Sequence, residues 1–294
     1  YANSLYLNPA FAGTARCPRV SLNYRNQWAS IPGNFVTYSA AYDQHFDVLS
    51  GGVGLLVTSD QAGQGVLTTN TASLLYSYQL PVTRHFSIKA GAQATYFEKR
   101  VNWDDLTFGD MIDPRKGFVY QTAEVRRDEP KRNVDFSAGI LGFSEKYYGG
   151  IAVHHLTEPD ESPIQGESKL PRKLTVHAGA ALPIMGLGGV EKGIISPNIV
   201  YMNQNKFNMI NYGFYATRGV VVGGLWFRQS FSNADAFIAL IGFQQESFKI
   251  GYSYDITVSK LANSTGGSHE ISFTYNFACR TKKVSYRTVN CPSF

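Results

Sequence analysis

Apolar and polar residues alternate with a period of two along most of the chain. In 86–96 (FSIKAGAQATY), even positions are apolar and odd positions are small or polar. The same alternation occurs in 173–182, 249–259 and 270–277. Successive side chains of a strand point to opposite faces, so this pattern predicts strands with one apolar and one polar face.

The composition of the two faces favours a membrane barrel over a soluble β-sandwich. The polar face holds Gly, Ser and Thr with occasional charges, whereas the apolar face ends in aromatic residues. Outer-membrane barrels need this pattern because lipid covers the outside and the lumen is polar. An open sheet edge in hydrocarbon would leave unpaired amides, so the sheet must close. We therefore predict an all-β chain that forms a transmembrane antiparallel β-barrel.

The alternating segments predict about 14 strands, an even number that suits a bacterial barrel with both termini on one side. We expect them near 19–29, 35–46, 52–61, 67–82, 86–100, 133–145, 147–159, 172–185, 195–207, 209–219, 221–231, 235–247, 248–259 and 269–278.

The lengths of the connections give an independent test of this topology. If the first strand rises from the periplasm, the odd-numbered connections are external and should be longer. They include 101–132, 160–171, 230–235 and 260–268, whereas the even ones include 80–84, 144–147, 217–219 and 245–247, with 185–193 as an exception. This alternation predicts an outer-membrane location with both termini in the periplasm.

The longest connection, 101–132, is charged and contains Trp103 and Phe108. We expect a short helix near 103–111. A loop of this length is usually functional or disordered. Trp103 and Phe108 are candidate contacts to a partner outside the cell, and a solvated flexible loop is the alternative.

Two terminal segments flank the predicted barrel of residues 19–278. Residues 1–18 contain NPAFAG (8–13), in which we expect Pro9 and Gly13 to shape turns while Leu7 and Phe11 pack at the barrel mouth as a plug. A mobile tail would not favour exposed Leu and Phe. Residues 279–294 form a basic periplasmic tail, interpreted either as a docking element or as an inert extension.

Composition narrows the class of protein. Of the 294 residues, 44% are hydrophobic and only 17% charged, against roughly 25% in soluble domains. No run approaches the roughly 20 apolar residues of a transmembrane helix. The net charge of +5 comes from scattered basic residues, which argues against nucleic-acid binding. The opening YANSLYLNPA lacks a signal-peptide pattern, so the chain is either cytosolic or already processed.

The three cysteines are Cys17, Cys279 and Cys291, and none lies in a CxxC motif. In an oxidising compartment, Cys279 and Cys291 are the candidate disulfide across the tail. Pairing through Cys17 and three unpaired thiols are the alternatives.

The sequence carries no motif for catalysis or for a cofactor. His154 and His155 are adjacent and point to opposite faces of a strand. No HExxH, calcium-loop, GxGxxG, phosphate-loop or GxSxG motif appears. A triad spread over neighbouring strands would leave no such trace. We expect no metal, no cofactor and no enzymatic activity.

Charges of both signs fall on the predicted lumen face. A single-sign ring would favour transport, whereas mixed signs favour ion pairs that fill the interior. The candidate network comprises Arg25, Lys89, Asp135, Arg228, Lys249, Asp255 and Glu270.

Six segments spread over the chain form a recognisable combination: YANSLYLNPAFAGT at the start, YRNQW (24–28), YSAAYD (38–43), IGYSYDITVSKL (250–261), GGSHEISFTYNF (266–277) and the final CPSF. Together they resemble the PorP/SprF family of Bacteroidetes type IX secretion and gliding machinery. The resemblance implies a non-enzymatic outer-membrane barrel that helps secrete or attach particular cargo. The implied partners are the C-terminal domain of a secreted adhesin, periplasmic or peptidoglycan-associated components of the apparatus, and outer-membrane lipid.

Three functions follow as hypotheses, the last of them an outer-membrane lipid hydrolase, which only scattered Ser and His residues suggest. The first is a secretion or anchoring partner for a specific surface adhesin. The second is a passive pore or a hydrophobic-solute transporter, since about 14 strands are enough to leave a lumen.

Overall fold

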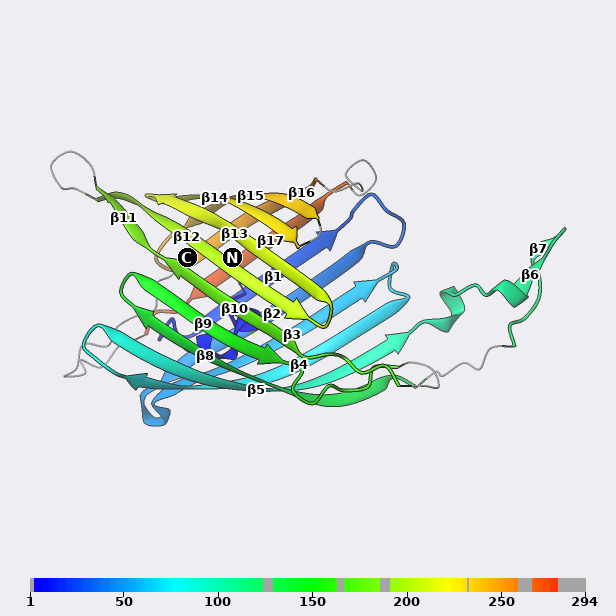
Figure 1. Cartoon of the computed structure of the whole chain (residues 1–294), viewed down its shortest axis with the longest axis horizontal. Coiled ribbons are helices and arrows are strands. Elements are labelled where there is room, and N and C mark those ends of the chain that lie inside the picture. The colour runs from blue at the N-terminus through cyan, green and yellow to red at the C-terminus, as the bar shows by residue number, and fades with distance from the viewer. Residues whose placement is uncertain are drawn as a thin grey trace.

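The structure is a computed structural model that describes residues 3–123, 129–162, 167–185, 191–231, 233–258 and 266–279. It is a closed antiparallel β-barrel with strongly tilted strands (Figure 1). The strands of the wall are β1 (Arg19–Gln27), β2 (Phe35–Phe46), β3 (Gly51–Ala62), β4 (Leu67–Pro81), β5 (Phe86–Val101), β8 (Lys131–Ser144), β9 (Tyr147–His154), β10 (Lys173–Ala180), β11 (Leu182–Met185), β12 (Glu191–Gln204), β13 (Phe207–Arg218), β14 (Val221–Ser230), β15 (Ala234–Gln244), β16 (Phe248–Thr257) and β17 (Ser268–Asn276).

Each strand pairs with its neighbour in the sequence, and the first strand pairs with the last. The β1–β17 register runs from Arg19 opposite Asn276 to Gln27 opposite Ser268. Of the 15 strands in the sheet, β10 and β11 are two pieces of one strand that both pair with β12. The wall therefore has the 14 strands expected from the sequence, and β2 has the predicted bounds.

The break between β10 and β11 corrects the continuous strand predicted for 172–185. Ala180 lies opposite Pro197 of β12 in the register that joins Gly179–Asn198 to Leu182–Ile195. Proline has no N–H to donate to a ladder. Ala181 continues the ladder on the β9 side by donating to the carbonyl of Lys146, whereas on the β12 side Pro197 has no N–H to donate.

The predicted strand 147–159 is also too long, because β9 ends at His154. His155 and Glu158 have positive φ angles of 60° and 46°. Residues other than glycine rarely adopt this left-handed backbone conformation, which turns the chain out of the sheet. Similarly, β1 ends at Gln27 because Trp28 has a φ of 60°.

The alternation of faces predicted for 86–96 is confirmed. Ser87, Lys89 and Gly91 are buried on the inner face of β5, while Phe86, Ala90 and Tyr96 are exposed outside. Other strands expose Leu74, Tyr76 and Phe214 outward and bury Ser73, Ser77 and Tyr215. An apolar exterior and a polar interior are what a lipid-embedded barrel requires.

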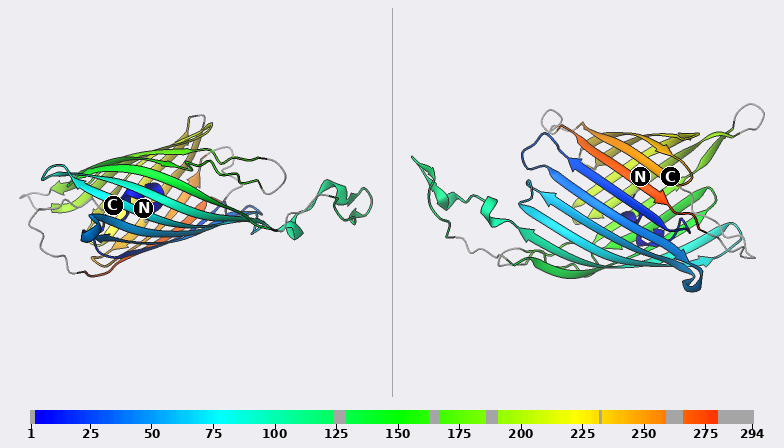
Figure 2. Two further views of the ribbon diagram at one scale, coloured as in Figure 1. Left: turned by 90° about the horizontal axis from the view of Figure 1, so that it is seen from below. Right: turned by 180° about the vertical axis from the view of Figure 1, so that it is seen from behind.

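Short connections lie at one end of the barrel, and the longer ones lie mainly at the other. The long connection after β5 holds the 3₁₀ turns η3 (Trp103–Asp105) and η4 (Gly109–Met111) and a small hairpin of β6 (Ile112–Asp113) and β7 (Gly117–Phe118). All views show this hairpin projecting far beyond the wall (Figures 1 and 2). The short-connection end carries the 3₁₀ turn η2 (Asp47–Leu49).

The N-terminal segment, residues 3–18, lies inside the barrel (Figure 2). It contains the helical turn α1 (Ser4–Leu7) and the 3₁₀ turn η1 (Pro9–Phe11). Among the described residues, no helix is long and apolar enough to cross a membrane.

Candidate functional site: the N-terminal segment inside the barrel

Asparagine caps and one proline set the local shape of the N-terminal segment. The Asn3 side chain caps α1 by accepting from the Tyr6 N–H, and Asn8 caps η1 by accepting from the Ala10 N–H at 2.9 Å. Pro9 follows as the first residue of η1, where its missing N–H costs nothing. Gly13, with φ of 68°, reverses the chain toward the wall.

Asn8 also joins the segment to the opposite wall. Its Nδ2 donates to the carbonyls of Ile140 and Ile151, at 3.2 and 3.3 Å, and lies 3.1 Å from Nε2 of His177. The Asn8 side chain is fully buried, so these bonds replace the water that the amide would otherwise bind. One short side chain thus links the segment to β8, β9 and β10.

Three glycines of the wall make room for the backbone of the segment. A Cβ at Gly52 would overlap the Ala12 carbonyl, one at Gly91 would overlap the Ala10 N–H, and one at Gly139 would overlap the Asn8 side chain. Glycine permits such close approach because it has no side chain. The inner wall is therefore shaped to fit residues 8–12.

Phe11 is the central apolar residue in the contact between the N-terminal segment and the inner wall of the barrel. It is 2% exposed and packs against Tyr148 and His177, with ring centroids 6.2 and 5.2 Å away. Leu5 is buried in the same cluster, and Leu7 packs against it while partly exposed. Burying a side chain of this size contributes about 1.5–3 kcal/mol relative to leaving it in water.

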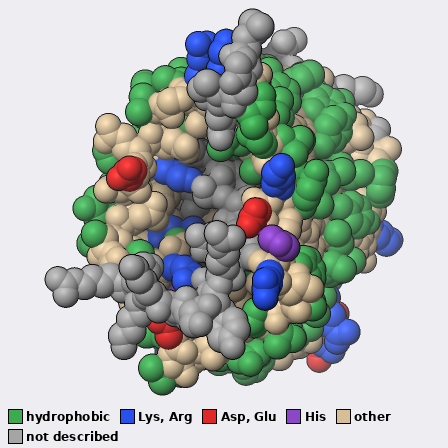
Figure 3. Space-filling model, turned by 90° about the vertical axis from the view of Figure 1, so that its left-hand side faces the viewer, with side chains coloured by type: hydrophobic (Ala, Val, Ile, Leu, Met, Phe, Trp, Pro, Cys, Tyr) green, Lys and Arg blue, Asp and Glu red, His purple; other side chains and the backbone are tan. Residues whose placement is uncertain are grey.

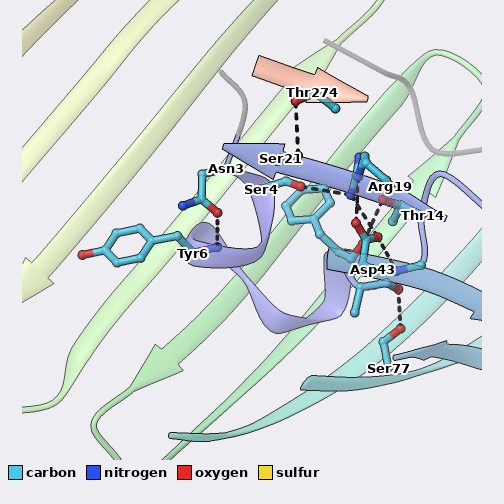
Figure 4. A network of polar contacts seen from close by, with 12 residues as sticks. Asn3, Ser4, Tyr6, Thr14, Arg19, Ser21, Asp43, Ser77 and Thr274 are labelled. Atoms are coloured by element: carbon cyan, nitrogen blue, oxygen red, sulfur yellow. Dashed lines mark hydrogen bonds and ion pairs between the residues drawn. The ribbon is translucent and has the colours of Figure 1, made fainter. Parts of the chain in front are cut away.

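The end of the segment is held by polar groups of the near wall (Figure 4). The Ala12 carbonyl accepts from Lys89 Nζ at 2.5 Å and from Ser77 Oγ at 2.7 Å. The Gly13 N–H donates to Asp43, whose other oxygen accepts from Arg19 Nε at 2.8 Å. Lys89 therefore binds the backbone of the segment.

A disulfide joins Cys17 to Cys279, with Cα atoms 5.4 Å apart. This corrects the pairing of Cys279 with Cys291 in favour of the alternative through Cys17. The physical reason is the closure of the barrel, since Arg19 of β1 lies opposite Asn276 of β17. The bridge ties the N-terminal segment to the end of the last strand.

Four of the seven predicted lumen charges meet on the wall formed by β1 and β14–β17. Asp255 Oδ2 accepts from Arg25 at 2.8 Å and from Arg228 at 2.9 Å, and Arg25 also donates to Glu270 at 3.0 Å. The other three lie apart: Lys89 binds Ala12, Asp135 pairs with His155 at 2.8 Å, and Lys249 makes no ion pair with any described residue.

Replacing Asp255 by alanine should destabilise the barrel by about 3–5 kcal/mol, because Arg25 and Arg228 then lose the buried carboxylate that they share and keep only Glu270 and Asp235 as partners. Asp255 is 1% exposed. Urea unfolding in lipid vesicles measures the change. The control is Asp235→Ala, which removes a carboxylate with 43% side-chain exposure and should cost no more than about 1 kcal/mol. Equal losses for the two variants would refute the assignment.

The proposed partner residues of the long loop lie close together near the barrel. Trp103 is buried and its ring stacks on Phe108 with centroids 6.3 Å apart. The exposed apolar residues lie further out, on or beside the β6–β7 hairpin. They are Ile112, Phe118, Val119 and Tyr120, with 47–60% of each residue exposed. The sequence analysis missed these four residues, although the run GFVY marks three of them.

The connection between β9 and β10 is fastened by one carboxylate. Asp160 accepts from Lys131 Nζ at 2.8 Å and from the N–H groups of Ser168 and Ser162. These bonds, with that from Lys131 the strongest, hold the pKa of Asp160 well below its usual range.

A pH dependence of this connection follows from the lowered Asp160 pKa. The stabilisation is complete above the ordinary Asp pKa of about 3.9 and is lost as pH falls toward the lowered folded value. Hydrogen-exchange protection at Ser162 and Ser168 should therefore fall between pH 6 and pH 3. In Asp160→Asn, protection should be low at both pH values, and an unchanged acid-dependent loss in that variant would exclude Asp160 as its cause.

The short-connection end of the barrel shows Lys and Arg side chains inside a ring of hydrophobic ones (Figure 3). Arg19 reaches Asp43 from this side of the lumen. Among the described residues, no group of three or more His, Cys, Asp or Glu is placed to hold a metal ion. The described part of the interior holds a fitted, hydrogen-bonded segment.

Solved structures similar to this chain are outer-membrane barrels. The Ralstonia pickettii toluene transporter TbuX aligns with a TM-score of 0.55 at 12% identity, covering 95% of this chain and 94% of that one. A TodX mutant, titled a monoaromatic hydrocarbon channel, gives 0.53 at 10% identity over 93% and 94%. The Acinetobacter baumannii outer membrane protein Omp33 gives 0.50 at 8% identity over 90% and 100%. At these identities the likeness concerns the fold.

Sequence comparison is more specific. No curated protein matches the chain significantly. The family model of the type IX secretion system membrane protein PorP/SprF matches residues 1–275, which include the fitted N-terminal segment and nearly all of the described wall. The chain is therefore an outer-membrane β-barrel that belongs to the PorP/SprF family of type IX secretion system membrane proteins.

Proposed function

We propose that this barrel acts without catalysis to help secrete a specific surface adhesin, or to anchor it at the cell surface. The observation that carries the proposal is the N-terminal segment in the lumen. Its contacts with Gly52, Gly91 and Gly139 and the buried Asn8 bonds are those of a permanent plug. A barrel filled in this way suits a docking platform better than a conduit.

The proposal assigns the two ends of the barrel to different partners. The short connections and both termini face the periplasm, as is usual for bacterial barrels. The basic tail 279–294 would engage periplasmic or peptidoglycan-associated components of the apparatus. The longer connections face outward, and the apolar side chains of the β6–β7 hairpin would contact the C-terminal domain of the adhesin. Exposed Ile112, Phe118 and Tyr120 suit such a contact, since aromatic residues are enriched at interfaces.

A hairpin variant tests the docking role. Changing Ile112, Phe118, Val119 and Tyr120 to serine should release the adhesin into the medium or leave it inside the cell, with the barrel still folded and inserted. The control is Phe207→Ser, which removes an 81% exposed aromatic residue from the first position of β13, next to the two-residue turn after β12 at the same end. Normal adhesin display in the hairpin variant, and in a strain lacking the protein, would overturn the proposal.

A passive pore or hydrophobic-solute transporter is the alternative, and the fold shared with TbuX and TodX favours it. Planar-bilayer recordings and uptake of a monoaromatic hydrocarbon separate the two functions. The docking proposal expects a silent bilayer and no uptake beyond that of vesicles without protein. Steady conductance of the intact barrel would establish the alternative instead.

A further inference from the structure

A groove of about 580 Å³ lies at the short-connection end of the wall, across β11–β14. Most of its lining comes from strand positions that share one face, and Thr217 of β13 is the exception. Ala216 lies on the same face of β13 as exposed Phe214, and Gly223 on the same face of β14 as exposed Leu225. In contrast, Tyr215 and Val222 point into the lumen and are buried. The groove therefore opens on the outer, membrane-facing side of the barrel.

The floor of the groove consists of small residues on three adjacent strands: Gly193, Ala216 and Gly223. Apart from Gly223 and its two chain neighbours, no heavy atom of the described residues lies within 4 Å of the point where a Cβ of Gly223 would stand. This open space adjoins Val221 on the same face of β14, whereas Ile184 lines the far side of the groove opposite Gly193; Ile184 and Val221 are 43% and 44% exposed. Their apolar surfaces make a slot suited to a hydrocarbon chain.

Two cations lie at the rim of this slot. Arg218 ends β13, and Lys192 lies where the β11–β12 pairing skips from Gly193 to Glu191. A bulge of this kind re-aims the side chain it contains. Both cations are exposed, and neither forms an ion pair with any residue that the structure describes. An apolar slot that ends in two exposed cations is complementary to an anionic headgroup with its acyl chain.

We propose that this groove binds an anionic glycerophospholipid, with an acyl chain over Gly193, Ala216 and Gly223 and the phosphate between Lys192 and Arg218. The proposal goes beyond the docking function and does not depend on the adhesin. It rests on the short-connection end facing the periplasm, where the adjacent leaflet is made of phospholipid.

Native mass spectrometry of the full chain tests the site. Protein delipidated by detergent washing is offered phosphatidylglycerol or phosphatidylethanolamine with identical acyl chains. Each of two cations should contribute about fivefold, so the wild type should prefer phosphatidylglycerol by roughly 25-fold. Lys192→Gln with Arg218→Gln should abolish this preference. Gly223→Leu should fill the slot and reduce retention of both lipids.

The matched control is Ala92→Leu, which enlarges an exposed, membrane-facing side chain of β5 far from the groove in the sheet order. It should bind as the wild type does, and the heat-modifiable mobility of every variant shows that the barrel is folded. Equal retention of the two lipids by the wild type would overturn the proposal. So would an unchanged preference in the double variant, or a stronger preference for lipid A than for phosphatidylglycerol.

Discussion

Replacing Gly91 by valine is expected to dislodge the N-terminal segment from the lumen. The new Cβ would overlap the backbone of Pro9 and Ala10, which has no room to move between the walls. Overpacking of this kind costs about 1–3 kcal/mol. The unseated state should therefore become roughly 5- to 150-fold more populated. Trypsin cleavage after Arg16 should accelerate by a similar factor, and the barrel should begin to conduct in planar bilayers.

Gly54→Ala is the control for this experiment, because it adds a methyl group to the same inner wall. Its Cβ would lie 3.3 Å from the flexible end of Leu5 and 3.5 Å from Ala12 and Leu75, so a small adjustment accommodates it. It should leave cleavage and conductance near wild-type values. If Gly91→Val stayed resistant to trypsin and electrically silent, the segment would not be what closes the lumen.

Cys17→Ser should lower the stability of the barrel by about 2–5 kcal/mol. The Cys17–Cys279 bridge spans 262 residues, and a cross-link over a long loop restricts the unfolded chain most. Urea unfolding of the barrel in lipid vesicles measures the loss. Cys279→Ser should behave in the same way, and a reducing agent should bring the wild type down to the level of both variants.

Cys291→Ser distinguishes the two pairings of Cys279. It should leave both the unfolding midpoint and the non-reduced gel mobility unchanged, because Cys279 is already bonded to Cys17. A midpoint lowered by Cys291→Ser, with Cys17→Ser silent, would restore the pairing expected from the tail alone.

The strands of the barrel wall could be predicted from the sequence, because each strand's own residues determine its two faces. Strand faces alternate residue by residue, so the segment 35–46 could be bounded from its own residues, and the segment 86–96 could be assigned to its two faces. Strand ends were harder where the backbone turns through a residue other than glycine, as at Trp28 and His155. The interruption at Pro197 depends on a partner strand, which a single strand does not reveal.

The interior could be predicted only in outline. Leu7, Pro9, Phe11 and Gly13 stood out as an unusual start, but the contacts of Asn8 reach across 132 to 169 residues of sequence. Nothing local marks Ile140 or His177 as its partners. The disulfide could have been predicted from the closure of the barrel. Pairing of the first and last strands brings Cys17 and Cys279 together whatever their separation in sequence.

That bridge also determines how the barrel bears mechanical load. Without it, tension on residues beyond Cys279 would load β17 alone, and only its ladders with β1 and β16 would resist the pull. With it, the tension enters β1 and β17 together at the same end of the barrel, where Arg19 lies opposite Asn276. The two strands then move as one unit, and the pull is resisted in shear by their full ladders with β2 and β16. A tail tethered to the cell wall would in this way pull on β1 and β17 together.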